Sequence, residues 1–98
     1  MSVKLNLVVN DTVIHTDYFV EAFIDHVVSG IIEALEGTGK IKDLDLSIHG
    51  GKTTINLNGA VVPINAFATK IIKSTIIGMV STLKEVHDIK KISIFLHK

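Results

Sequence analysis

The glycine pair at residues 50 and 51 constrains this 98-residue chain more than any other feature. Two alternating segments flank it, and a two-residue Gly-Gly loop is a favoured hairpin connection because glycine adopts positive φ without steric cost. The expected register pairs His49 with Lys52 and Leu46 with Ile55. One face of this hairpin is then polar and the other almost wholly apolar. That pattern predicts a half-buried antiparallel pair, which needs neighbouring strands and a covering layer.

Two further strands are predicted near the ends of the chain. Residues 3–9 and 91–97 alternate apolar and polar side chains, as strands with one buried face do. Residues 12–16 fit either a loop or a short continuation of the first strand. The two halves of the chain are similar in size, and we identify no clear sequence repeat beyond that.

Two helices are predicted between the strands. Residues 17–35 carry apolar side chains at helical spacing, with Asp17 as a candidate N-cap and Gly37 where a helix-ending glycine belongs. A second helical pattern continues to about residue 86. Either Pro63, in the first turn, or Asn65, as the cap, can begin it.

The element order is therefore β-α-β-β-α-β in a single domain spanning residues 1–98. An α+β sandwich with a four-stranded antiparallel sheet and two helices on one face is the ferredoxin-like arrangement. Its usual strand order, 4-1-3-2, places the first and third strands in the centre. We expect that order here because it turns all four apolar strand faces towards the helices.

Composition excludes several classes of function. The chain has no cysteine, so a disulfide framework and a thiolate metal site are impossible. Its lysines balance its acidic residues and it contains no arginine, which argues against nucleic-acid binding. No apolar run is long enough to cross a bilayer and no signal-peptide pattern opens the chain. We therefore expect a cytoplasmic protein that binds neither nucleic acid nor membrane.

The sequence contains no recognisable catalytic or metal-binding motif. The five histidines lack the close spacing that puts two metal ligands on one element. In the expected fold His49 and His97 lie on opposite edge strands, about 14 Å apart, because strands are spaced by about 4.8 Å. Asp43 and Asp45 share a solvent-facing edge strand, which offers no desolvation for acid–base work. No metal, cofactor or catalytic residue is predicted.

Polar side chains on the outer face of the sheet are the candidate ligand-binding residues. This face combines a lysine, amides, a hydroxyl and a carboxylate, which suit a small polar ligand. The candidates are Lys4, Asn6, Asp45, Thr54 and Asn56.

Both helices carry more apolar surface than a helix lying on a sheet needs. The surplus residues, which we expect to form a subunit interface, are Val28, Ile32, Ile77 and Val80. The free face of the first helix is mainly acidic and that of the second mainly basic, so two copies can pair their charges at the rim of such an interface. We therefore predict a homodimer or higher homo-oligomer.

The leading functional hypothesis is a homo-oligomeric binding or structural module without catalytic activity of its own. A first alternative is a small enzyme whose site assembles between subunits from His26 or His49 and a carboxylate. A second alternative is an accessory domain that binds a larger protein partner.

Overall fold

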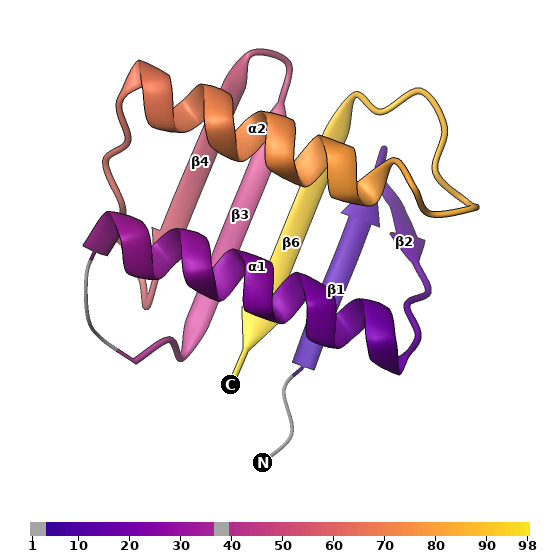
Figure 1. Ribbon diagram of the computed structural model, residues 1–98, viewed down its shortest axis with the longest axis horizontal. Coiled ribbons are helices and arrows are strands. Elements are labelled where there is room, and N and C mark those ends of the chain that lie inside the picture. Colours follow the sequence, from indigo (N-terminus) through magenta and orange to yellow (C-terminus); the bar gives the residue numbers. More distant parts are fainter. Residues whose placement is uncertain (1–3, 37–39) are drawn as a thin grey trace.

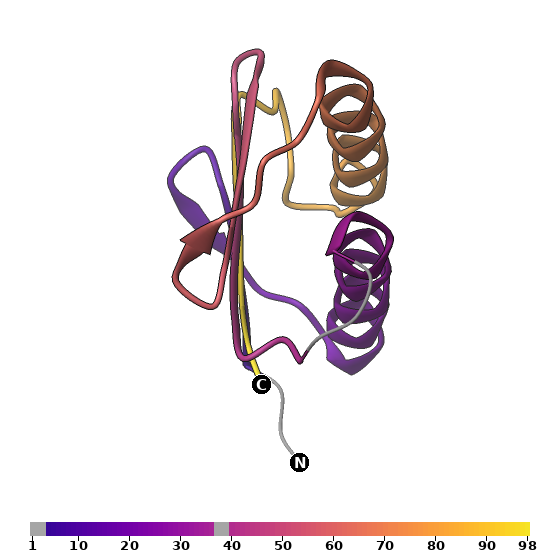
Figure 2. The same ribbon diagram turned by 90° about the vertical axis from the view of Figure 1, so that its left-hand side faces the viewer.

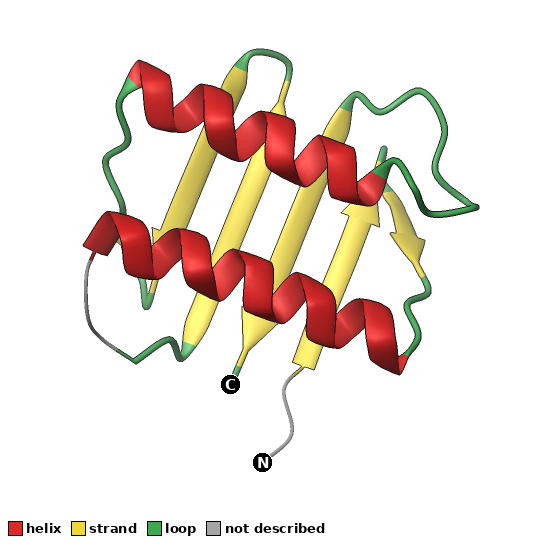
Figure 3. Cartoon of the chain, viewed as in Figure 1, coloured by secondary structure: helices red, strands yellow, loops and turns green. Residues whose placement is uncertain are grey.

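The computed structural model describes residues 4–36 and 40–98 and shows two layers. One layer is a six-stranded sheet in which all paired neighbours are antiparallel. The other consists of two helices side by side on one face of the sheet, running across the strands (Figures 1 and 3). In chain order the elements are β1 (Lys4–Val9), β2 (Thr12–Ile14), α1 (Tyr18–Glu36), β3 (Asp43–His49), β4 (Lys52–Leu57), β5 (Ala60–Val61), α2 (Ala66–Val80) and β6 (Lys91–His97).

The central hairpin forms with the predicted register. β3 pairs with β4 so that His49 lies opposite Lys52 and Leu46 opposite Ile55. Of the two turn glycines only Gly50 has a positive φ, of 62°. The β6 strand also has its predicted bounds.

The ferredoxin-like prediction is wrong. The sheet has six strands in the order β2-β1-β6-β3-β4-β5, so β6 and β3 are central rather than the first and third predicted strands. The two short strands that the sequence analysis did not resolve explain the difference. β1 turns back into β2, and β4 turns back into β5. β1 and β4 therefore each have only one edge left for pairing with another long strand.

Two-residue turns of the same kind form both outer hairpins. Asn10 and Asp11 have φ values of 50° and 67°, and Asn58 and Gly59 have 50° and 86°. Positive φ at both central positions marks the hairpin turn that matches strand twist, and Asn-Gly is its strongest sequence signal. Both hairpins bend out on the side of the sheet opposite the helices (Figure 2).

Both helices begin at a capping side chain. Asp17 accepts a hydrogen bond from Val20 N, as predicted, and Asn65 rather than Pro63 caps α2 by accepting from Ala68 N. α2 ends at Val80, earlier than expected, where the hydroxyls of Ser81 and Thr82 donate to carbonyls of the last turn. Such side-chain bonds compete with continuation of the helix. The predicted helix-ending Gly37 lies outside the described residues.

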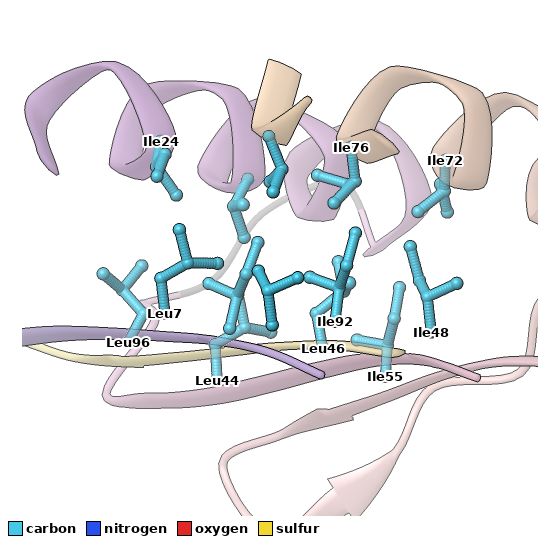
Figure 4. Packing of buried hydrophobic residues seen from close by; sticks show 14 of the residues in the cluster. Leu7, Ile24, Leu44, Leu46, Ile48, Ile55, Ile72, Ile76, Ile92 and Leu96 are labelled. Carbon is cyan, nitrogen blue, oxygen red and sulfur yellow. The ribbon is translucent and has the colours of Figure 1, made fainter. Parts of the chain in front are cut away.

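The core fills the space between the sheet and the helices (Figure 4). Its most buried strand residues, all fully inaccessible to solvent, are Leu44 and Leu46 of β3, Ile94 and Leu96 of β6, and Ile55 of β4. Within the described ranges no helix is long and apolar enough to cross a membrane.

The structure has an internal two-fold pseudosymmetry that we did not recognise in the sequence. Each element of the second half starts 48 residues after its counterpart: Lys4 and Lys52, Thr12 and Ala60, Tyr18 and Ala66, Asp43 and Lys91. Exchanging the halves leaves the strand order unchanged, which places the pseudo-axis between β3 and β6. At the same offset, without gaps, the identical residue pairs are Lys4/Lys52, Asn10/Asn58, Val13/Val61, Phe19/Phe67, Ile24/Ile72, Gly30/Gly78, Leu35/Leu83, Ile41/Ile89, Lys42/Lys90 and His49/His97.

Candidate functional site

The outer sheet face carries all five predicted ligand-binding residues. Asn6, Asp45 and Asn56 lie in one row across neighbouring strands, with Phe95 between Asn6 and Asp45. The other two stand outside that row: Thr54 in the row of Ser47, and Lys4 at one end beside His97. Across the long strands this face is therefore mainly polar around one aromatic ring, Phe95, which is 41% exposed, and Val13 and Val61 of the two short strands are exposed at its edges.

A histidine–carboxylate pair lies at one end of this platform. Nδ1 of His97 contacts Oδ1 of Asp43, because β6 and β3 are neighbours and place the two residues opposite each other. The contact orients the imidazole. Both side chains are 52% exposed, so the pair lacks the desolvation that tunes acid–base catalysts. The sequence pattern alone does not reveal this pair, because the expected strand order places Asp43 and His97 on separate edges of the sheet.

The other histidine expectations also change. His49 and His97 lie on adjacent strands rather than opposite edges, and His49 faces Lys91 at the far end of the shared ladder. His26 lies on α1, on the helix side of the molecule. No cluster of three metal-ligating side chains occurs in the part of the chain that the structure describes.

The outward face of the helix layer is the most apolar exposed surface on these elements. Phe19 and Phe67, at equivalent positions of α1 and α2, are each 71% exposed, and Phe23 and Ile71 follow one turn later at 49% and 48%. At 100° per residue the same stripe continues through His26 and Gly30 on α1, and through Ser74 and Gly78 on α2. We call these two rows the outer helix stripes.

A shallow hollow lies at the α1 stripe. It has a volume of about 370 Å³ and is lined by Phe19, Ala22, Phe23, His26 and Val27. The rings of Phe19 and Phe23 lie with their centroids 6.1 Å apart in a tilted arrangement, which suits aromatic pairs. The surface therefore contains a largely nonpolar recess.

The predicted interface residues lie elsewhere. Val28, Ile32 and Val80 are at most 4% exposed within the chain's own core, and Ile77 is half-buried against it. The reason is that Val28, Ile32 and Val80 lie on the sides of α1 and α2 that pack on the core above the sheet. Helical periodicity identified these residues as apolar but could not show which ones the sheet covers.

The two helices differ in charge, as the sequence indicates. The described side chains of α1 include Glu21, Asp25 and Glu33 and no lysine, whereas α2 has Lys70 and Lys73 and no acidic residue. Asp25 already pairs with Lys98 at 3.1 Å. Glu33 and Lys70 are exposed beside the outer helix stripes.

Comparisons with known proteins supply no relative for these surfaces: no family model matches the chain, and neither a curated protein nor a solved structure matches it.

Proposed function

We propose that this protein is a homo-oligomeric binding module that self-associates through the outer helix stripes. The observation that carries the proposal is the exposure of Phe19 and Phe67, 71% each, on one face of the helix layer. Aromatic side chains are among the few interface residues whose truncation to alanine costs a large part of the binding free energy. These phenylalanines lie on the side of each helix that faces away from the core, where a solvent-exposed helix normally carries charged and polar residues.

The glycines of the stripes support the same proposal. Gly30 and Gly78 are exposed within their helices, and a Cβ at either position would meet nothing within 4 Å. Glycine in an exposed helix interior costs about 1 kcal/mol relative to alanine, and no contact within the described part of the chain accounts for that cost. Close approach of a second molecule to the helix backbone does account for it.

The helix side of the molecule is large enough for a stable dimer. Viewed down the shortest axis, as in Figure 1, the Cα positions extend over 34 × 34 Å. A typical specific interface buries about 800 Å² of each partner, which fits within that outline.

The test is the mass in solution of a Phe19→Ser/Phe67→Ser variant, measured by sedimentation equilibrium over a range of concentrations. We expect the wild type to dimerise and the variant to dissociate at least about 30-fold more readily, as for loss of a central aromatic contact. Phe95→Ser is the matched control, because Phe95 is an exposed aromatic on the opposite layer. Circular dichroism verifies folding of both variants. A wild type that stays monomeric at several hundred micromolar contradicts the proposal.

Self-association through the helices leaves the outer sheet face free, and we propose ligand binding there. Asn6 and Asp45 flank Phe95 with an amide and a carboxylate, and Asn56 lies next to Asp45 in the same row. An aromatic platform with such neighbours suits a small neutral polar molecule such as a sugar, which stacks on the ring and hydrogen-bonds at its edge. Titration of ¹⁵N-labelled protein with a panel of mono- and disaccharides tests this. Shifts confined to β1, β6, β3 and β4 support the site, and their absence contradicts it.

The cytoplasmic location expected from the sequence stays part of the proposal. Immunodetection in fractionated native cells tests it.

A further inference from the structure

The internal repeat shows which exposed positions the two halves have kept in common. On the outer helix stripes Phe19 matches Phe67 and Gly30 matches Gly78, while Phe23 is matched by the large apolar Ile71. Burial in the core explains other repeated residues such as Ile24 and Ile72. It does not explain an identical exposed phenylalanine and an identical exposed helix glycine in each half.

The outer sheet face keeps the repeat only in part: Lys4/Lys52, Val13/Val61 and His49/His97 are identical and exposed there, but the residues between them differ. Under the 48-residue offset Asp45 corresponds to Ser93, Ser47 to Phe95 and Asp43 to Lys91. The two ends of the sheet therefore differ, with Asp43 beside His97 and Lys91 beside His49. On the helix side the pseudosymmetry extends along the stripes apart from His26 and Ser74, and on the sheet side it is lost at the centre of the face, at Asp45 and Ser93 and at Ser47 and Phe95.

We propose that the partner on the outer helix stripes is a second copy of this chain placed on the same pseudo-two-fold axis, with α1 of each chain packed against α2 of the other. The inference rests on the self-association proposed above and specifies its geometry. A partner centred on the axis contacts both halves alike, which requires equivalent residues in both stripes. An exact two-fold axis that relates one copy to the other, distinct from the pseudo-two-fold within each chain, then makes the contact self-complementary.

Two copies can stack helix layer on helix layer, with their pseudo-two-fold axes coincident and their helices aligned, in two ways. The charges of the helices distinguish between them. If α1 lies on the partner's α1, acidic helix meets acidic helix and the lysines of the two α2 helices meet each other. If α1 lies on the partner's α2, Glu33 of one chain and Lys70 of the other flank the same stripe contact. Like charges at an interface rim are unfavourable and opposite charges are favourable, so the second arrangement is the one we infer.

A charge-exchange experiment on the full-length chain tests this arrangement. Glu33→Lys and Lys70→Glu each introduce like charges twice per dimer, and we expect each to weaken dimerisation by about tenfold. The double variant exchanges the charges across the interface, and we expect its dissociation constant to return to within about threefold of the wild type. Lys52→Glu, on the outer sheet face, is the matched control and should leave the dissociation constant unchanged.

The outcomes separate the two proposals. A monomeric wild type overturns self-association itself. A dimeric wild type whose double variant is no tighter than the single variants overturns only the α1-on-α2 geometry. Unequal losses from Phe19→Ser and Phe67→Ser, differing by more than tenfold, would overturn the common axis, since equivalent contacts predict equal effects.

Discussion

Two asparagines at equivalent positions fasten the loops that enter the central strands. Asn58 accepts hydrogen bonds from the backbone N–H groups of Lys42 and Asp43 and donates to the carbonyl of Lys40. Asn10 makes the same kind of contacts with the segment that enters β6, accepting from Lys90 N. Both asparagines adopt positive φ, a conformation that asparagine tolerates better than most residues. Each position requires both these side-chain hydrogen bonds and a positive φ, which explains why asparagine occupies both.

Substitutions at these asparagines separate the hydrogen bonds from the backbone conformation. We expect Asn58→Gly to lower the free energy of unfolding by about 3 kcal/mol, the sum of three lost hydrogen bonds worth about 1 kcal/mol each. Asn58→Ala should cost about 1 kcal/mol more, because alanine resists positive φ. Urea denaturation measures both. Equal losses in the two variants would show that positive φ contributes nothing, and Asn10 should repeat the pattern.

Thr53 is the one buried polar residue of the core in the described chain, and its hydroxyl has no hydrogen-bond partner there. Its counterpart in the first half is the apolar Leu5. We expect Thr53→Val to raise the free energy of unfolding by about 1 kcal/mol, since it removes an unpaired buried hydroxyl at little change in shape. Thr54→Val, on the outer face, is the control and should change it by less than about 0.5 kcal/mol. Destabilisation by Thr53→Val would instead show that the hydroxyl is hydrogen-bonded in solution.

At the scale of the element, the inner and outer faces of each helix differ in what their residues do. Their inner faces contribute Ile24, Ile72 and Ile76 to the core (Figure 4). Their outer faces keep phenylalanine and glycine where charge would serve a solvated helix better. Stability alone therefore does not explain the composition of the helices.

The Gly30→Ala/Gly78→Ala variant separates the effect of these glycines on stability from their effect on dimerisation. A Cβ has open space at both positions, so we expect alanine to raise the stability of dilute, monomeric protein by about 1 kcal/mol per site. The added methyl groups should weaken dimerisation by holding the partner away. Thr75→Ala is the matched control, because it raises helix propensity without adding atoms to the stripe. A variant that dimerises as tightly as the wild type would argue against close approach at the glycines.

At the scale of the whole molecule, the two halves are interlocked. β3 of the first half lies between β6 and β4 of the second, and β6 lies between β1 and β3 of the first. Neither half contains a sheet in which its own long strands are neighbours. The fold therefore depends on pairing between halves, as in a dimer whose subunits have been joined.

A circular permutant tests this equivalence. Lys4 lies opposite His97 as Lys52 lies opposite His49, so a two-residue turn of Lys98 and one glycine should join His97 to Lys4. With new termini between Gly50 and Gly51, we expect a cooperative transition and a far-UV spectrum like the wild type. A parallel permutant opened within β3 should not fold, because it interrupts a central strand. Loss of structure in the first permutant would contradict the equivalence of the two connections.

Local pattern was sufficient to predict both helices, the β3–β4 register and the N-cap at Asp17, because periodicity and capping depend on residues near in sequence. It also placed the polar candidates Asn6, Asp45 and Asn56 on one sheet face. Asn58-Gly59 carried a hairpin signal that would have revealed β5. The 48-residue repeat is equally present in the sequence, but the few identities became persuasive only once the matching elements were known.

Strand order and the exposed surface were decided by tertiary structure alone. The predicted and observed orders both turn the apolar strand faces towards the helices, so hydrophobic pattern does not distinguish them. Which edges remain free decides the order, and the outer hairpins occupy one edge of β1 and one of β4. Likewise Val28 and Phe19 are both apolar residues of one helix, and only the position of the sheet beneath α1 buries the first and exposes the second.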